Sequence, residues 1–383
     1  MASFIGLQSV YIVALLGSLL LTYHVPVLVE GRMDMATRLT QEEELNIERQ
    51  LGILNKPPTK TIHAPWGDTY DCIEFHKQPT FDHPLLKHHK IKMNEEFLST
   101  NSTKTSMNQV DRCLKGTVPI RRTTRGDFIR AKLSSNAQAD QYRAGVSYQT
   151  KLDETIHGAS GIFNVWNPSV NRDQFSSAEI ALQSGSLEQT NVIKYGWRVD
   201  PQLYGDDVTR SFAYWTADGG KSTGCYNTLC YGFVQTHSVY TPDMHFSKMS
   251  EIGGEQVMLS VQISLDKLEG KWWLTLGENI QIGYWPKELL PGFLPGATSV
   301  FWGGRVKSGE DGSSPPMGSG QPVSAYVADA GSVDTLQYIN MNNKSLKPEK
   351  TEDTIDCPEH YEAEYYPDHN ILHFGGRGGP KCK

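Results

Sequence analysis

The stretch FWGGRVKSG (301–309) ends a predicted strand with two glycines and then Arg305. An arginine after a strand is ordinarily a solvated surface side chain, and it cannot act as a general base because it stays protonated in proteins. The usual catalytic patterns are missing: the sequence has no G-x-S-x-G, no H-E-x-x-H, no P-loop and no G-x-G-x-x-G after a strand. The sequence therefore argues against a serine, zinc or nucleotide-dependent enzyme.

The cysteines favour disulfides over a metal site. There are six of them, an even number, and they fall as three sequential pairs: Cys72, Cys113, Cys225, Cys230, Cys357 and Cys382. The twelve histidines, including His88 and His89, show no zinc-type spacing. We therefore predict three disulfides, one of them between Cys72 and Cys113, and no metal or cofactor.

Alternating apolar residues mark three strands that carry a charged side chain each, namely SAEIALQ (177–183), VIKYGWRV (192–199) and SVFWGGRV (299–306). The period of two places Glu179, Lys194 and Arg305 opposite the apolar side chains of their strands. All three should therefore point away from the core. Alternation alone does not distinguish an open sheet face, where they would be plain surface residues, from a binding cleft.

The second part of the chain is predicted to be mainly β-structure. Apolar and polar residues alternate from Val257 to Ser264, and KWWLTL (271–276) and IQIGYW (280–285) flank the turn Gly277-Glu278-Asn279 as a hairpin. Many strands separated by Gly, Pro, Asn and Asp, with hardly any helix, favour a sandwich or barrel.

The N-terminus predicts export. The apolar run from Val10 to Leu21 is shorter than the roughly 20 residues of a membrane helix but suits the core of a signal peptide, which we place at 1–31. No later apolar run reaches membrane length, so we expect no membrane span in the mature protein. The sequons at Asn101 and Asn343 predict N-glycosylation. The formal net charge of −7 gives no basic surface for nucleic acid.

Residues 32–133 differ in character from the rest of the chain. Thr40 and Glu43 form a capping-box start for a helix that should stop at Pro57-Pro58. A loop-rich segment then leads to a basic stretch, 121–132, which we expect to be exposed. We place the domain boundary after 133, which leaves 134–383 as the β-domain.

Several long blocks resemble the neprosin family of plant glutamic peptidases. In the β-domain they are IFNVWNPSV (162–170), YGWRVDPQLYGD (195–206), YWTADGGKSTGCYNTLCYGFVQ (214–235), GYWPKELL (283–290), WGG (302–304) and MGSG (317–320). The first half resembles the neprosin activation peptide in DCIEFHKQPTFDHPLLKHH (71–89) and CLKGTVPIRR (113–122).

This resemblance implies an antiparallel β-sandwich with a concave active cleft, preceded by a smaller, disulfide-linked activation-peptide domain that keeps the cleft shut until acid processing. It also implies the disulfides Cys225–Cys230 and Cys357–Cys382. The family's chemistry uses two glutamates, one as general base on water and the other as proton donor, with a glutamine near the oxyanion. Like charges at close range push the two carboxyl pKa values apart.

By the resemblance, the two glutamate positions fall on Lys194 and Arg305, and the glutamine position falls on Glu179. The sequence therefore predicts a secreted, extracellular pseudopeptidase of the cell wall or apoplast. The alternative is an active, proline-preferring endopeptidase that uses other carboxylates, of which Glu188 and Glu310 are near in sequence.

The same substitution suggests a ligand class. Two cations on one face need anions, and Glu179 can neutralise one of them. The other, with Arg305 the better candidate because of its planar fork, would then be free to bind a peptide carboxylate or an acidic polysaccharide. The alternative is a closed Glu179–Lys194–Arg305 cluster that merely fills the former cleft.

Overall fold

We analysed a computed structural model of the chain, which describes residues 40–89, 111–135, 140–151, 153–186, 189–323 and 329–382. The chain divides into one unit that ends at Glu44 and a second that begins at Leu45. The predicted signal peptide and Asn101 lie outside the described residues. Within the described ranges, none of the helices has the length and apolar character needed to cross a membrane.

The helix α1 (Gln41–Leu54) begins as the sequence predicts. The backbone N–H of Thr40 donates to the Glu43 carboxylate at 2.9 Å, and the N–H of Glu43 donates to the Thr40 hydroxyl at 3.2 Å, which is a reciprocal capping box. Ile47 and Leu54 are buried, and the helix ends before Pro57.

A small antiparallel sheet in the order β1-β2-β3 follows α1. Its strands are β1 (Lys60–His63), β2 (Thr69–Glu74) and β3 (Thr117–Arg121). The predicted disulfide joins Cys72 on β2 to Cys113, with a Cα–Cα distance of 5.6 Å. Three short 3-10 turns come after β2, at Phe75–Lys77, Pro79–Asp82 and Pro84–Leu86, and α2 (Arg125–Ser135) comes after β3.

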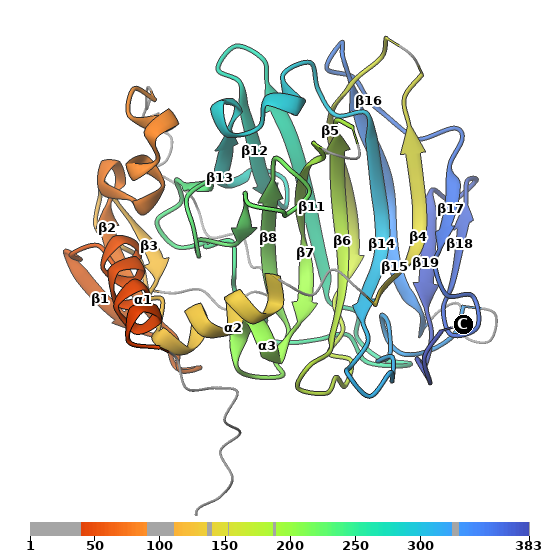
Figure 1. The fold of residues 1–383 in the computed structure, drawn as a ribbon. Helices are drawn as coiled ribbons and strands as arrows, with labels where there is room; N and C mark the ends of the chain where they lie inside the picture. The colour runs from red at the N-terminus through yellow and green to blue at the C-terminus, as the bar shows by residue number, and fades with distance from the viewer. Residues whose placement is uncertain are drawn as a thin grey trace, which may run out of the picture. The chain divides into compact units, whose positions relative to one another are not determined.

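Two larger antiparallel sheets form a sandwich, as predicted (Figure 1). The seven-stranded sheet contains, in spatial order, β17 (Glu352–Ile355), β4 (Gln141–Gln149), β14 (Ser299–Lys307), β6 (Phe175–Ser184), β7 (Asn191–Val199), β8 (Arg210–Thr216) and β9 (Cys225–Tyr226). The nine-stranded sheet contains β10 (Val234–Gln235), β13 (Ile280–Pro286), β12 (Lys271–Leu276), β11 (Met258–Asp266), β5 (Ile156–Asn164), β15 (Gly331–Asn340), β19 (Ile371–Gly375) and β18 (Glu362–Tyr366), with β16 (Ser345–Leu346) paired to β15.

The predicted hairpin is confirmed, because β12 and β13 pair antiparallel and Leu276 stands opposite Ile280. Helical structure between the strands is short and includes α3 (Pro201–Tyr204) and the 3-10 turns Lys287–Leu289 and Pro291–Phe293.

Tryptophans on the inner face of the seven-stranded sheet join the two layers. Trp197 on β7 is fully buried and its indole N–H donates to the carbonyl of Asn164 at 2.8 Å. Trp302 on β14 is also fully buried and donates to the carbonyl of Ser160 at 3.0 Å. Both acceptors belong to β5 of the other sheet, so the indoles satisfy their only donor inside the core. The predicted apolar faces of β7 and β14 are therefore the core faces.

One prediction about the basic stretch was wrong. Arg121 is not exposed: only 11% of its side chain is accessible, and it donates to Asp68 at 3.0 Å and to Asp127 at 3.2 Å. Arg210 at the start of β8 also contacts Asp68, and its side chain is only 2% accessible. Buried charges require partners. These acidic residues therefore hold Arg121 and Arg210 inside the structure.

Candidate functional site

Three neighbouring strands bring Glu179, Lys194 and Arg305 together. β6 lies between β14 and β7, and Glu179 on β6 stands opposite Gly303 on one side and Gly196 on the other. Arg305 lies two residues beyond Gly303, and Lys194 two residues before Gly196. The two cations therefore reach Glu179 from diagonal positions on opposite sides, within range of long side chains.

The two glycines beside Glu179 are required by the close approach of the strands. A Cβ atom at Gly196 would lie 1.9 Å from the carbonyl oxygen of Ala178, and one at Gly303 would lie 2.4 Å from the carbonyl oxygen of Ala144. Gly303 also has a φ of 150°, a conformation that side chains rarely adopt. The positions beside Glu179 thus carry no side chains.

The three charged groups form a closed cluster. The ammonium of Lys194 lies 3.1 Å from Oε1 of Glu179, and Nε of Arg305 donates to the same oxygen at 2.7 Å. The Glu179 side chain is completely buried, whereas Lys194 and Arg305 keep 16% and 17% of their side chains accessible. We expected Glu179 to neutralise one cation, but it contacts both.

The cluster shifts the pKa values of its members in the acid direction. Burial alone would raise the pKa of Glu179, but Arg305 and Lys194 outweigh it and lower that pKa from 4.5 to about 2. Burial and the positive charge of Arg305 lower the pKa of Lys194 from 10.5 to about 8, against the attraction of Glu179. The carboxylate is therefore ionised throughout mild acid, and the lysine releases its proton as the pH rises through about 8.

The pairs around the cluster contain residues that the sequence analysis missed. Arg143 on β4 stands opposite Arg305 and contacts Asp356 at 2.9 Å. Arg198 on β7 contacts Asp200 at 2.7 Å. Asp200 does carry a sequence signal, since an aspartate before a proline is typical of a helix N-cap, and it caps α3. Nothing in the sequence links Asp356 to Arg143, which lies 213 residues away.

The cluster and the two ion pairs beside it, Arg143–Asp356 and Arg198–Asp200, together contain four cations and three carboxylates. Asp356 and Asp200 each serve one arginine, while Glu179 serves both Lys194 and Arg305. In the Arg305 side chain only Nε makes a hydrogen bond with another described residue, so the donors of its two terminal nitrogens are unused within these residues. The group therefore carries a net positive charge and includes an accessible guanidinium.

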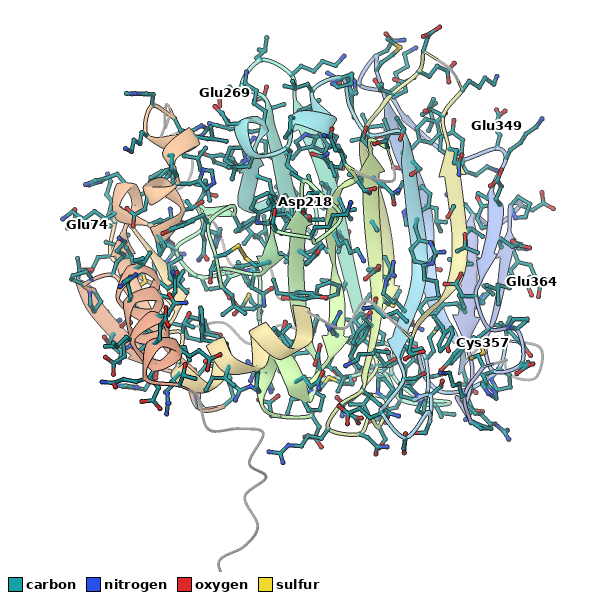
Figure 2. The ribbon with its side chains drawn as sticks, in the orientation of Figure 1. Glu74, Asp218, Glu269, Glu349, Cys357 and Glu364 are labelled. Atoms are coloured by element: carbon teal, nitrogen blue, oxygen red, sulfur yellow. A yellow bond between two sulfur atoms is a disulfide. The ribbon has the colours of Figure 1, made fainter. Side chains whose placement is uncertain are left out.

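Two other carboxylates in the described ranges, Asp218 and Glu310, lie in a loop and a turn outside the cluster. Asp218 lies in the loop between β8 and β9 (Figure 2), where hydrogen bonds from Ser222 and Thr223 outweigh burial and hold its pKa well below the usual range. Glu310 is exposed in a turn, and its backbone N–H donates to Asp173. Glu188 lies outside the described residues.

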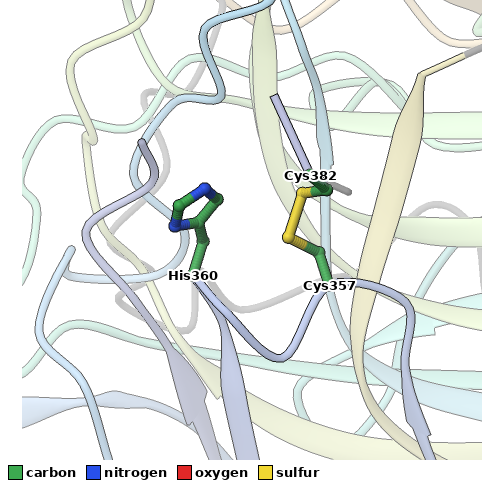
Figure 3. A group of neighbouring side chains, drawn as sticks. All are labelled: Cys357, His360 and Cys382. Atoms are coloured by element: carbon green, nitrogen blue, oxygen red, sulfur yellow. A yellow bond between two sulfur atoms is a disulfide. The ribbon is translucent and has the colours of Figure 1, made fainter. Parts of the chain in front are cut away.

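One group of side chains has metal-ligand types at close range, namely Cys357, His360 and Cys382. Figure 3 shows the two sulfurs joined to each other, which is the predicted disulfide, with a Cα–Cα distance of 5.9 Å. Joined sulfurs offer no thiolate, so only His360 could ligate a metal in this form. The remaining predicted disulfide, Cys225–Cys230, is also present. Asn343 is exposed in the turn between β15 and β16.

The chain belongs to the neprosin family. Residues 172–377, more than half of the chain, match Neprosin, and residues 61–161 match the Neprosin activation peptide. The second match continues past α2 into β4 and β5 of the sandwich.

Three solved structures of peptidases are similar over 62% of this chain and 98% of their own. Two are scytalido-glutamic peptidase with transition-state analogs, at 11% and 10% identity and a TM-score of 0.36 each. The third is SCP-B, a member of the eqolisin family in complex with the tripeptide Ala-Ile-His, at 9% identity and a TM-score of 0.35.

Proposed function

We propose that this neprosin-family protein is a secreted, extracellular pseudopeptidase whose glutamic peptidase chemistry has been lost. The observation that carries the proposal is the closed cluster of Glu179 with Lys194 and Arg305. Glutamic peptidase chemistry needs one ionised and one protonated carboxyl at close range. A single carboxylate held ionised between two cations has no proton to give in mild acid, and its side chain is completely buried, so it is not placed to activate water.

The test is a cleavage assay with proline-containing peptides across about pH 2–6, using the full chain before and after acid treatment. Loss of both general acid and general base should cost at least ~10²–10⁴ in rate. We expect no cleavage above the level of a mock preparation. Turnover that co-purifies with the protein through successive columns would favour the alternative of an active proline-preferring endopeptidase that uses other carboxylates.

Restoring the family's residues tests the positional assignment. The triple variant Lys194→Glu, Arg305→Glu, Glu179→Gln should gain acid-dependent cleavage, whereas either single change to glutamate should not. A folded triple variant without activity would count against the assignment of these positions to the former catalytic residues.

We further propose that the cluster binds acidic ligands, such as a peptide carboxylate or an acidic polysaccharide. The supporting observation is the excess of cations over carboxylates, together with the unused donors of the terminal nitrogens of Arg305, whose side chain is 17% accessible. A planar guanidinium can hold a carboxylate through two parallel hydrogen bonds. In calorimetric titrations, oligogalacturonate should bind and a neutral oligomer should not. Binding should weaken with salt and with Arg305→Ala. Equal or absent binding of both oligomers would favour a cluster that only fills the former cleft.

A further inference from the structure

Lys194 and Arg305 differ in the chemistry that they can offer to one ligand. Both contact the same oxygen of Glu179, so their nitrogens lie close together, and both side chains remain partly accessible. Arg305 presents unused donors for a carboxylate. Lys194 carries a primary amine, which can act as a nucleophile toward a carbonyl carbon when it is unprotonated.

We propose that this site captures small 2-oxo acids covalently, with Arg305 binding the carboxylate and Lys194 forming an imine with the adjacent carbonyl carbon. The inference rests on the proposed binding of carboxylates at Arg305 and specifies the ligand class. In a 2-oxo acid the carbonyl carbon is bonded directly to the carboxylate carbon, so one small molecule can engage two neighbouring side chains.

The step balances without an added oxidant or reductant. The neutral amine of Lys194 adds to the carbonyl carbon, and both amine hydrogens then leave with the carbonyl oxygen as water. The product is an imine, C=N, which becomes a cationic iminium on protonation. Glu179 remains ionised beneath it and stabilises the iminium charge, as it stabilises the ammonium in the free protein.

The surroundings of Lys194 make its free amine available at a lower pH than that of an ordinary lysine, near pH 8. Its neighbours are Glu179 on β6, Arg305 on β14, Arg198 on its own strand and Tyr214 on β8, whose ring centre lies 5.7 Å from the ammonium. Burial and the positive charge of Arg305 lower the pKa of Lys194 to about 8 despite Glu179. A surface lysine, with an ordinary pKa near 10.4, is almost fully protonated at that pH. Capture should therefore be selective for Lys194 and should increase as pH rises through 8.

The experiment incubates the full chain with pyruvate or glyoxylate and sodium cyanoborohydride, which reduces an imine to a stable secondary amine. Peptide mapping by mass spectrometry then locates the adduct. We expect one major adduct, on Lys194, that is absent from Lys194→Arg. The matched control Lys248→Arg replaces a lysine that is 67% accessible and should leave the adduct unchanged. Labelling spread over surface lysines without preference for Lys194 in the wild-type chain would overturn the proposal.

The role of Arg305 is tested by comparing two carbonyl compounds. Arg305→Ala should lower the ratio of pyruvate labelling to propionaldehyde labelling about tenfold or more, the order of a lost charged hydrogen bond, because propionaldehyde has no carboxylate and responds only to the change in the pKa of Lys194. Equal effects on both compounds would overturn the assignment of 2-oxo acids. Calorimetry with lactate separates this inference from the proposed function. If lactate binds but pyruvate leaves no adduct, only the carbonyl capture fails; if neither binds, carboxylate binding at Arg305 fails too.

Discussion

Removal of the charge of Glu179 should destabilise the sandwich by a few kcal/mol. Glu179→Gln keeps the size of the side chain but leaves Lys194 and Arg305 facing each other without a carboxylate. The carboxyl pKa falls from 4.5 to about 2 in the folded chain, which corresponds to about 3 kcal/mol of preference for the ionised form. Breaking one partner of a buried ion pair costs a similar ~3–5 kcal/mol. We therefore expect the variant to lose about 3 kcal/mol of unfolding free energy at pH 6.5.

The difference in unfolding free energy between the wild type and Glu179→Gln should depend on pH. Because the pKa of Glu179 is lowered on folding, its stabilisation is fully present above pH 4.5 and disappears as the pH falls toward 2. Denaturant unfolding of both proteins should show a wide gap at pH 6.5 that narrows below pH 4.5. Glu352→Gln, an exposed carboxylate on β17, serves as the control and should change little. A Glu179→Gln variant within about 0.5 kcal/mol of wild type at pH 6.5 would refute the reasoning.

Two further predictions concern other parts of the chain. Asp68→Asn removes the carboxylate shared by Arg121 and Arg210, and should lower the unfolding free energy by roughly 3–5 kcal/mol. Proteolysis of residues 45–135 should then be faster than in the control Glu349→Gln, which changes an exposed carboxylate; equal rates of digestion would contradict this. Arg210 and Arg121 outweigh burial and lower the pKa of Asp68, so the wild-type contact should also weaken as pH falls below about 4. Replacing both Cys357 and Cys382 by serine opens a bridge with a sequence separation of 25, and should lower stability by about 3 kcal/mol in thermal or denaturant unfolding. Reduction of the wild type opens all three bridges and should lower stability at least as much.

The face of the sheet on which each charge lies could be predicted from the sequence, but its contacts could not. A strand has a period of two, so the apolar residues beside Lys194 and Arg305 were sufficient to place both opposite the core. The shared contact depends on the register of β6 against β7 and β14, and Arg305 on β14 lies 126 residues from Glu179 along the chain. Arg121 shows the same limit for one of its two partners, because Asp68 lies 53 residues earlier.

The charge of the cluster also determines how the site should respond to acid. A pair of carboxyl groups changes its protonation within the acid range, and this change is what makes glutamic peptidase chemistry depend on acid. Glu179 is ionised down to about pH 2 and Lys194 keeps its proton up to about pH 8, so the cluster holds one charge state between these limits. An ordinary ligand carboxylate is ionised above about pH 4. Between about pH 4 and 8 the site therefore stays positively charged and an acidic ligand stays negatively charged, so they attract each other throughout this range. The proposed binding of anions does not require acidification.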